Sequence, residues 1–272
     1  MFVRFSGKCA VILLATVMLS CTAVAGAGGA ENGGNYWKGY LTDTSNILTS
    51  PARWEKEDWI KASLVVGITA GLYAYDENIR SWAQKKRNST SDDMASFAKP
   101  FGDGRYTLPP LGLLYLGGRY YDNERARQTA MLGLESFVVT GVFTQTLKFS
   151  THRHRPDTGD PHTRWDGPGS SNSDLSFPSG HASSAFAVAT VIAAQYNDSA
   201  FIPPLAYAVA TLAALSRVND DAHWASDAFL GSAIGYFTAK AIVGAHRAGG
   251  GNMALVPAVD GRHAGFLAAY RF

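Results

Sequence analysis

Two histidines in this chain lie in contexts that suit nucleophilic and acid–base chemistry. His223 is followed four residues later by Asp227, and His181 comes directly after Pro178-Ser179-Gly180. Residues four apart share a face on a helix, so the Asp227 carboxylate could accept the Nδ1 proton of His223 and leave Nε2 as a nucleophile. Taken alone, each context is explained more simply, as a surface His–Asp pair and as an ordinary capped helix.

The helix expected to begin after Pro178 can hold an anion. Ser179 is a suitable N-cap, and its hydroxyl and the first free N–H groups then point toward one spot, where the helix dipole favours negative charge. Gly180 allows the backbone to approach closely. His181 would lie beside that anion and, when protonated, could donate to a leaving-group oxygen.

Three fixed cations accompany these segments, namely Lys148, Arg155 and Arg217. A phosphoryl group in its transition state spreads charge over its equatorial oxygens, and forked guanidinium groups match that geometry. The cations therefore predict a phosphate-binding cluster, although each alone could be a solvated helix charge. The intervening His-Arg-His sequence at 152–154 is interpreted as loop or surface residues rather than ligands.

The chemistry-bearing segments form an ordered signature. They are Lys148 to Pro156 (KFSTHRHRP), Pro178 to His181 (PSGH) and Ser216 to Asp227 (SRVNDDAHWASD). In this order they resemble the three-part signature of the type 2 phosphatidic acid phosphatase superfamily, which includes lipid phosphatases, bacterial class A acid phosphatases and vanadium haloperoxidases. The resemblance extends over roughly Trp59 to His246 as a helix pattern, and it is specific only in the motifs.

The resemblance implies a role for each matched residue. His223 attacks phosphorus and forms a phosphohistidine that water then hydrolyses, Asp227 orients His223, and His181 protonates the leaving group. The phosphate oxygens are bound by Lys148, Arg155, Ser179, Gly180, His181 and Arg217. No metal or other cofactor is implied, and the sequence has no Cys/His or HExxH cluster with metal-ligand spacing. The family fold is an α-helical bundle.

The composition fits a folded domain with a large core. Of the 272 residues 46% are hydrophobic and 17% are charged, and the formal net charge of +2 gives no indication of nucleic-acid binding. The apolar runs are mostly shorter than the roughly 20 residues that a spanning helix needs, and the mean hydropathy of -0.05 is low for a polytopic protein. We expect a globular or peripherally membrane-associated bundle, with a polytopic protein of short helices as the alternative and the oligomeric state open.

The N-terminal segment has the features of a secretory signal. Basic residues precede an apolar run from Cys9 to Leu19, and Ala23-Val24-Ala25 is a small-x-small cleavage site. These features predict a signal peptide over residues 1–25, export to a periplasm and a mature chain without cysteine. Lipid modification of Cys21 and an uncleaved N-terminal anchor are the alternatives.

The rest of the chain divides into three predicted parts. Residues 26–54 form a leader, residues 55–248 a helical phosphatase domain, and residues 252–272 a C-terminal β-hairpin that turns at Asp260-Gly261. Apolar residues recur at helical spacing, Pro109-Pro110 is expected to open a helix, and many alanines and glycines favour close helix packing. The predicted fold is all-α, a helical bundle of the acid phosphatase/vanadium haloperoxidase type with a short hairpin packed on it.

The expected function is a metal-independent phosphatase of the cell envelope that cleaves a phosphate monoester or diphosphate. The apolar helices favour a lipid substrate, such as phosphatidate, phosphatidylglycerol phosphate, undecaprenyl diphosphate or a lipid A phosphate. A membrane surface is the second expected partner. A soluble periplasmic acid phosphatase, a vanadate-dependent haloperoxidase and a non-catalytic binding protein are the alternatives. The loop from Asp157 to Ser176 lies between two motifs and is predicted to set substrate preference.

Overall fold

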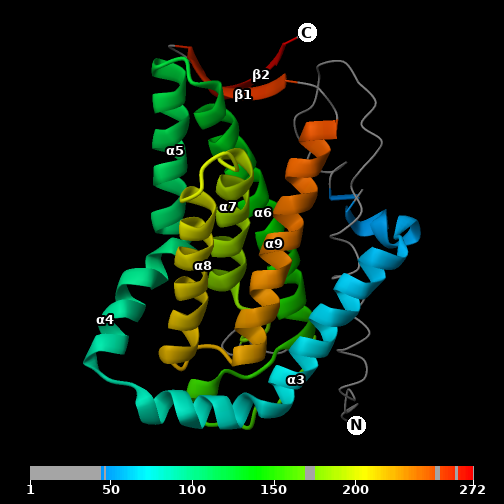
Figure 1. Ribbon diagram of the computed structural model, residues 1–272, viewed down its shortest axis with the longest axis vertical. Helices are drawn as coiled ribbons and strands as arrows, with labels where there is room; N and C mark the ends of the chain where they lie inside the picture. Colours follow the sequence, from blue (N-terminus) through cyan, green and yellow to red (C-terminus); the bar gives the residue numbers. More distant parts are fainter. Residues whose placement is uncertain (1–43, 46, 169–174, 249–251, 261–262, 272) are drawn as a thin grey trace.

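The computed structural model describes residues 44–45, 47–168, 175–248, 252–260 and 263–271, and these form a set of long helices with one hairpin (Figure 1). The predicted signal peptide, Cys21 and most of the leader lie outside the described residues. The helices are α3 (Lys56–Lys86), α4 (Ser89–Ala98), α5 (Gly104–Tyr120), α6 (Glu124–Thr151), α7 (Gly180–Gln195), α8 (Ile202–Asn219) and α9 (Ala225–Ala248). Short 3-10 turns lie at η2 (Ser50–Arg53), η3 (Lys99–Gly102) and η4 (Pro156–Thr158).

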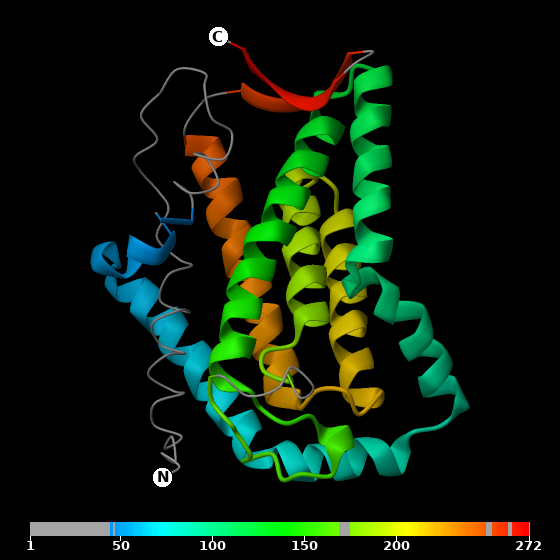
Figure 2. The same cartoon turned by 180° about the vertical axis from the view of Figure 1, so that it is seen from behind.

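Helix α7 runs through the middle of the bundle, with α6, α8 and α9 around it (Figures 1 and 2). Its sequence is rich in small residues, and Ala182, Ala187 and Val191 are completely buried. Two glycines of α9 let that helix approach α7 closely. A Cβ at Gly231 would lie 2.4 Å from the Ser179 carbonyl oxygen, and one at Gly235 would lie 2.1 Å from that of Ser183. The close helix packing predicted from the small residues is therefore confirmed between these two helices.

Helix α3 crosses the end of the bundle at which α7 and α9 begin (Figures 1 and 2). It carries one buried carboxylate, that of Asp76, a residue that is 1% exposed. Because a buried carboxylate is unfavourable without a partner, this residue marks where α3 must meet a cation or several donors.

Helix boundaries follow local capping groups. Asn123 caps α6 by accepting from the Ala126 N–H at 3.0 Å, and the helix ends where His152 adopts a left-handed conformation with φ of 43°. Helix α5 begins at Gly104, because the Asp103 side chain accepts from the Arg105 N–H at 3.0 Å. The expectation that Pro109-Pro110 opens this helix is therefore wrong, since both prolines lie inside it.

The C-terminal strands β1 (Asn252–Asp260) and β2 (His263–Arg271) pair antiparallel. Asn252 lies opposite Arg271, and Asp260 lies opposite His263. The pair lies at the end of the bundle far from α3 (Figure 1). It contributes nothing to the site described below.

Two helices of the described chain, α6 and α9 as far as Arg247, are long and apolar enough to cross a membrane by length and composition. In each, 56% of the most apolar window is buried inside the bundle, as it would be in the core helices of a soluble protein. Large apolar side chains are nevertheless exposed along the outer helices. They include Trp59, Ile60, Leu64, Tyr75 and Trp82 on α3, Leu113, Leu116 and Tyr120 on α5, and Leu205, Leu212 and Leu215 on α8.

Candidate active site

The eight predicted site residues meet at one end of the bundle. Lys148 is in the last turn of α6 and Arg155 is in the loop that follows; Ser179, Gly180 and His181 begin α7, Arg217 lies near the end of α8, and His223 and Asp227 flank the start of α9. The Ser179 N–H donates to the Asp227 carbonyl at 3.0 Å, which joins the first turns of α7 and α9. The Lys148 side chain passes within 3.9 Å of the space that a Cβ at Gly180 would fill.

Ser179 caps helix α7, as its position in the sequence predicts. Its Oγ accepts from the Ala182 N–H at 3.4 Å, and Ser179 itself is completely buried. The first N–H groups of the helix remain without intrahelical partners, as they do at every helix start. This end of α7 therefore offers donors and a positive dipole end to an anion.

Lys148, Arg155 and Arg217 form a cluster of positive charge. Lys148 is 8% exposed, and its Nζ donates to the carbonyl oxygens of Leu175 at 2.6 Å and Ser176 at 3.3 Å. Burial, together with the nearby charges of Arg155 and Arg217, lowers the pKa of Lys148 to about 7. Three cations that destabilise one another in this way favour a site that receives an anion.

The two guanidinium groups of this cluster keep unused donors. Arg217 Nη1 donates to Asp220 Oδ2 at 2.8 Å. The Nε atoms of Arg217 and Arg155 are both buried, and neither has a hydrogen-bond partner among the residues that the structure describes. A buried donor without a partner costs about 1–3 kcal/mol, so these two atoms indicate where ligand oxygens belong.

His181 lies at the edge of the cation cluster. Burial lowers its pKa to about 4, and the positive charge of Arg217 adds to the effect, so the ring of the unliganded protein is neutral at pH 7. Its Nε2 is buried and makes no hydrogen bond within the described chain. A bound phosphate would place negative charge nearby and raise this pKa, so the group gains its proton when an anion arrives.

His223 lies in a bend just before α9, which begins at Ala225. The expectation that His223 and Asp227 share a helix face is therefore wrong. The His223 Nδ1 is 3.9 Å from Asp227 Oδ2, which is too long for a direct hydrogen bond. Burial lowers the pKa of His223 to about 3, so the ring is neutral and one nitrogen has a free lone pair.

Ser176 lies between these two groups. Its Oγ donates to Asp227 Oδ2 at 2.5 Å and is 3.5 Å from His223 Nδ1. The same carboxylate oxygen accepts from the Trp224 N–H at 3.1 Å, so Asp227 also caps the start of α9 and leaves His223 outside the helix. The sequence analysis did not identify Ser176, which precedes the Pro178-Ser179-Gly180 motif by two residues.

Arg153 balances the charge of Asp227. Burial would raise the pKa of the Asp227 carboxyl, but the Arg153 guanidinium and the hydrogen bond from Ser176 outweigh it and lower the pKa to about 2. Arg153 Nη1 donates to Asp227 Oδ1 at 2.5 Å, and Nη2 donates to Asp76 Oδ2 at 2.8 Å. The guanidinium carbon also lies 4.8, 5.0 and 5.4 Å from the ring centroids of Tyr73, Trp165 and Trp224.

The interpretation of residues 152–154 as surface residues is wrong. They do lie in a loop, but His152, Arg153 and His154 are only 3%, 0% and 6% exposed. One feature of the sequence points to a buried cation such as Arg153, and that feature is Asp76. This residue follows a long apolar run on α3, and a carboxylate in such a place needs a buried cation.

His154 fixes the loop that follows α6. Its Nδ1 lies 2.7 Å from Asp160 Oδ2 and its Nε2 lies 2.8 Å from Asp166 Oδ2. Burial opposes the charged ring, but hydrogen bonds to both carboxylates raise the pKa of His154 above its ordinary value. This clamp holds the first part of the loop predicted to set substrate preference. Residues 169–174 of that loop lie outside the described residues, and its role stays a prediction.

Comparison with known proteins places these residues in a family context. Over 131 residues the chain is 41% identical to a lipid A 1-phosphatase of Porphyromonas gingivalis, an alignment that spans 47% of this chain and only 26% of that protein. A transmembrane PAP2-type phosphatidylglycerolphosphate phosphatase from Bacillus subtilis aligns with 78% of this chain and 94% of its own, at 18% identity and a TM-score of 0.49. LpxE from Aquifex aeolicus aligns with 61% of this chain and 93% of its own, at 20% identity and a TM-score of 0.46.

The family match itself covers residues 129–249 and bears the description PAP2 superfamily. It ends before β1 and gives the predicted hairpin no support. It includes all eight predicted site residues, which run from Lys148 to Asp227. Over this segment, which is less than half of the chain, the sequence matches the PAP2 superfamily.

Proposed function

We propose that this chain is a metal-independent lipid phosphatase that works through a phosphohistidine. The observation that carries the proposal is the buried cation cluster of Lys148, Arg155 and Arg217, with its unpaired Nε donors, beside the start of α7 and a neutral His223. A phosphoryl group needs this combination of fixed positive charge, oriented N–H groups and a nucleophile. The family match and the curated relative support the same reaction class.

In the first step the phosphate oxygens bind the cation cluster and the first N–H groups of α7. His223 attacks phosphorus, the bond from phosphorus to the leaving oxygen breaks, and His181 gives its proton to that oxygen. The His223 ring then carries a positive charge as a phosphohistidine. The buried Asp227 carboxylate, held ionised by Arg153, balances that charge from 3.9 Å away.

In the second step water attacks phosphorus and gives a proton to the now neutral His181. The nitrogen–phosphorus bond breaks, inorganic phosphate leaves and His223 returns to its neutral form. His181 therefore acts as an acid in the first step and as a base in the second, which its perturbed pKa permits once the phosphate is bound.

Two observations support a lipid substrate at the cell envelope. Apolar side chains are exposed along α3, α5 and α8, and this surface could contact a bilayer that supplies the substrate. The relative from Porphyromonas gingivalis is named for a lipid substrate. Export through the predicted signal peptide belongs to the proposal, since residues 1–25 lie outside the described chain.

The test is phosphate release by the purified chain in the presence of EDTA. A soluble monoester, phosphatidate, a lipid A phosphate and a polyprenyl diphosphate are offered side by side, with His223→Ala as the matched inactive variant. We expect EDTA-resistant release from a lipid ester, and an acid-labile, alkali-stable phosphoryl label on the wild-type chain alone. Release that survives in His223→Ala would overturn the mechanism. Halide oxidation with bound vanadate and no phosphate release would overturn the reaction class.

A further inference from the structure

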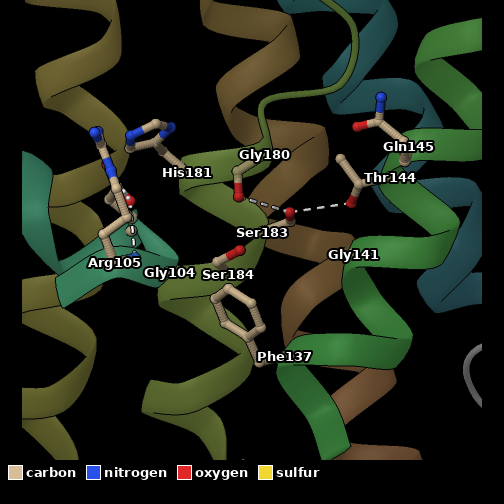
Figure 3. A pocket seen from close by; sticks show the side chains of 12 residues that line it. Gly104, Arg105, Phe137, Gly141, Thr144, Gln145, Gly180, His181, Ser183 and Ser184 are labelled. Atoms are coloured by element: carbon tan, nitrogen blue, oxygen red, sulfur yellow. Dashed lines mark hydrogen bonds and ion pairs between the residues drawn. The ribbon is translucent and has the colours of Figure 1, made fainter. Parts of the chain in front are cut away.

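A pocket of about 290 Å³ opens beside the first turn of α7 (Figure 3). Its walls come from the start of α5, from α6 and from α7. The side chains that matter are Asp103, Arg105, Phe137, Gln145, His181 and Ser184. Figure 3 shows Arg105 beside His181 on one side of α7 and Gln145 on the other.

The position of the pocket relates it to the leaving group. His181 lines it, whereas His223 and Asp227 do not. In phosphoryl transfer the attacking and leaving atoms lie roughly in line on opposite sides of phosphorus. A phosphate attacked by His223 therefore directs its leaving oxygen toward His181, and the rest of the leaving group enters this pocket.

The wall of the pocket near His181 has little freedom to move. A Cβ at Gly102 would lie 2.4 Å from the His181 carbonyl oxygen, and one at Gly104 would lie 2.8 Å from the Phe137 ring. The junction of η3 and α5 is thus seated directly on α7 and α6. This wall of the pocket is therefore already formed and can select a ligand without a rearrangement of the backbone.

The charges at the pocket mouth cancel. Arg105 Nη2 donates to Asp103 Oδ2 at 2.6 Å, and its Nε lies 3.1 Å from both carboxylate oxygens. These hydrogen bonds lower the pKa of Asp103 to about 2, so the pair is fully ionised and has no net charge at pH 7. The pocket lining contains no other lysine, arginine or acidic side chain. A leaving group with its own phosphate would find no spare cation here and would lie beside a carboxylate.

The remaining polar side chains of the pocket suit a ligand that carries hydroxyl groups. The side chains of Gln145 and Ser184 make no hydrogen bond to any part of the chain that the structure describes, so a ligand can use their donors and acceptors. Phe137 adds an apolar ring. The volume is at the lower end of the roughly 300–1,000 Å³ typical of ligand sites, so it holds the group next to the phosphate but not acyl chains.

We infer that this pocket binds a neutral, hydroxyl-bearing leaving group, such as a sugar ring or a glycerol unit, and that the chain prefers phosphomonoesters of such alcohols to diphosphates. The inference rests on the proposed function, because the in-line geometry assumes attack by His223. It narrows the candidate substrates by a criterion that the shared motifs do not supply.

The experiment compares kcat/KM for four phosphate esters in detergent micelles. They are an acylated glucosamine 1-phosphate, lysophosphatidate (whose leaving group is a neutral monoacylglycerol with a free hydroxyl), dodecyl phosphate and farnesyl diphosphate. We expect one of the first two to exceed both of the last two by at least about tenfold, since a site that hydrogen-bonds substrate hydroxyls rejects analogues without them. Which of the two is preferred decides between a sugar ring and a glycerol unit.

Variants separate this inference from the proposed function. Gln145→Ala should reduce the preference for the hydroxylated ester over dodecyl phosphate to about threefold or less. Gln128→Ala, on the same helix but bonded to Glu124 at 3.1 Å outside the pocket, should leave the preference unchanged. A wild-type preference for dodecyl phosphate or the diphosphate, or a Gln145→Ala enzyme with unchanged preference, would overturn the inference and leave the phosphatase intact. No turnover of any ester would overturn both.

Discussion

Arg153 and Arg155 stand two residues apart in one loop, and their surroundings are opposite. Arg153 is completely buried, donates to Asp76, Asp227 and Ser226, and is enclosed by aromatic rings. Arg155 has a buried Nε with no partner among the described residues, and it adds to a cluster of like charges. A cation with its counter-ions in place contributes to structure, whereas a cation left without them is available to a ligand.

The difference also divides the site into two halves. The half around Asp227 is complete without a ligand, because each of its charges has a partner in hydrogen-bond distance. The half around Lys148, Arg155 and Arg217 is incomplete, because charge repulsion and unused donors remain. Loss of a charged side chain should therefore affect folding in the first half, and phosphate binding and turnover in the second.

Arg153→Met should have the largest effect, and it should fall on stability. It leaves Asp76 and Asp227 buried without a cation, and breaking a buried pair in this way costs about 3–5 kcal/mol. The measurement is the free energy of unfolding in denaturant. Arg164→Met is the matched control, because the Arg164 side chain is 51% exposed in the same loop. Equal stability of the two variants would contradict the structural role of Arg153.

Arg155→Gln should act on the reaction and not on the fold. We expect kcat/KM to fall by about 10²–10³, the effect of removing one preorganised donor to a transition-state oxyanion. The melting temperature should stay the same or rise, because the like-charge repulsion on Lys148 is relieved. A loss of stability as large as that of Arg153→Met would remove the distinction between the two arginines.

The pH dependence of kcat/KM tests the charge on Lys148. Its pKa of about 7 means that the free protein loses this positive charge as the pH rises through 7, so phosphate binding and kcat/KM should fall above that pH. A guanidinium keeps its charge, so in Lys148→Arg the fall in kcat/KM above pH 7 should disappear, even if the overall rate is lower. If kcat/KM of Lys148→Arg still falls above pH 7, the fall is caused by the titration of another group and not of Lys148.

Ser176→Ala should have the smallest effect of the four. Its hydroxyl bonds Asp227 and approaches His223, but Arg153 and the Trp224 N–H still hold the carboxylate. We expect kcat to fall by about tenfold with little change in KM, the effect of losing one hydrogen bond to a charged group at about 1.5 kcal/mol. A larger loss than that of Arg155→Gln would show that His223 depends on Ser176 for its orientation.

The sequence predicts one site from the types and order of the motif residues, and the structure brings these residues to one end of the bundle. The predicted phosphate-binding cations are separated in the sequence, and the fold brings them into one cluster of Lys148, Arg155 and Arg217. The helical bundle was predictable because apolar periodicity and small residues dictate it. The Arg153–Asp76 pair was not, because its partners are 77 residues apart and a motif treats the intervening positions as spacers. The position of His223 outside the helix was not predicted either. The i, i+4 spacing does not reveal that Asp227 accepts from the Trp224 N–H and that the helix therefore starts after the histidine.

The contact between α9 and α7 has a consequence for the reaction. His181 begins one of these helices, and His223 precedes the other. Gly231 and Gly235 set how near the two helices can come, since a methyl group at either would overlap a carbonyl of α7. The separation between the proposed nucleophile and the proposed acid therefore depends on two glycines that lie one or two helical turns away from the site. A chain that gained either methyl group could retain every reactive residue and still hold them too far apart to act on one phosphate.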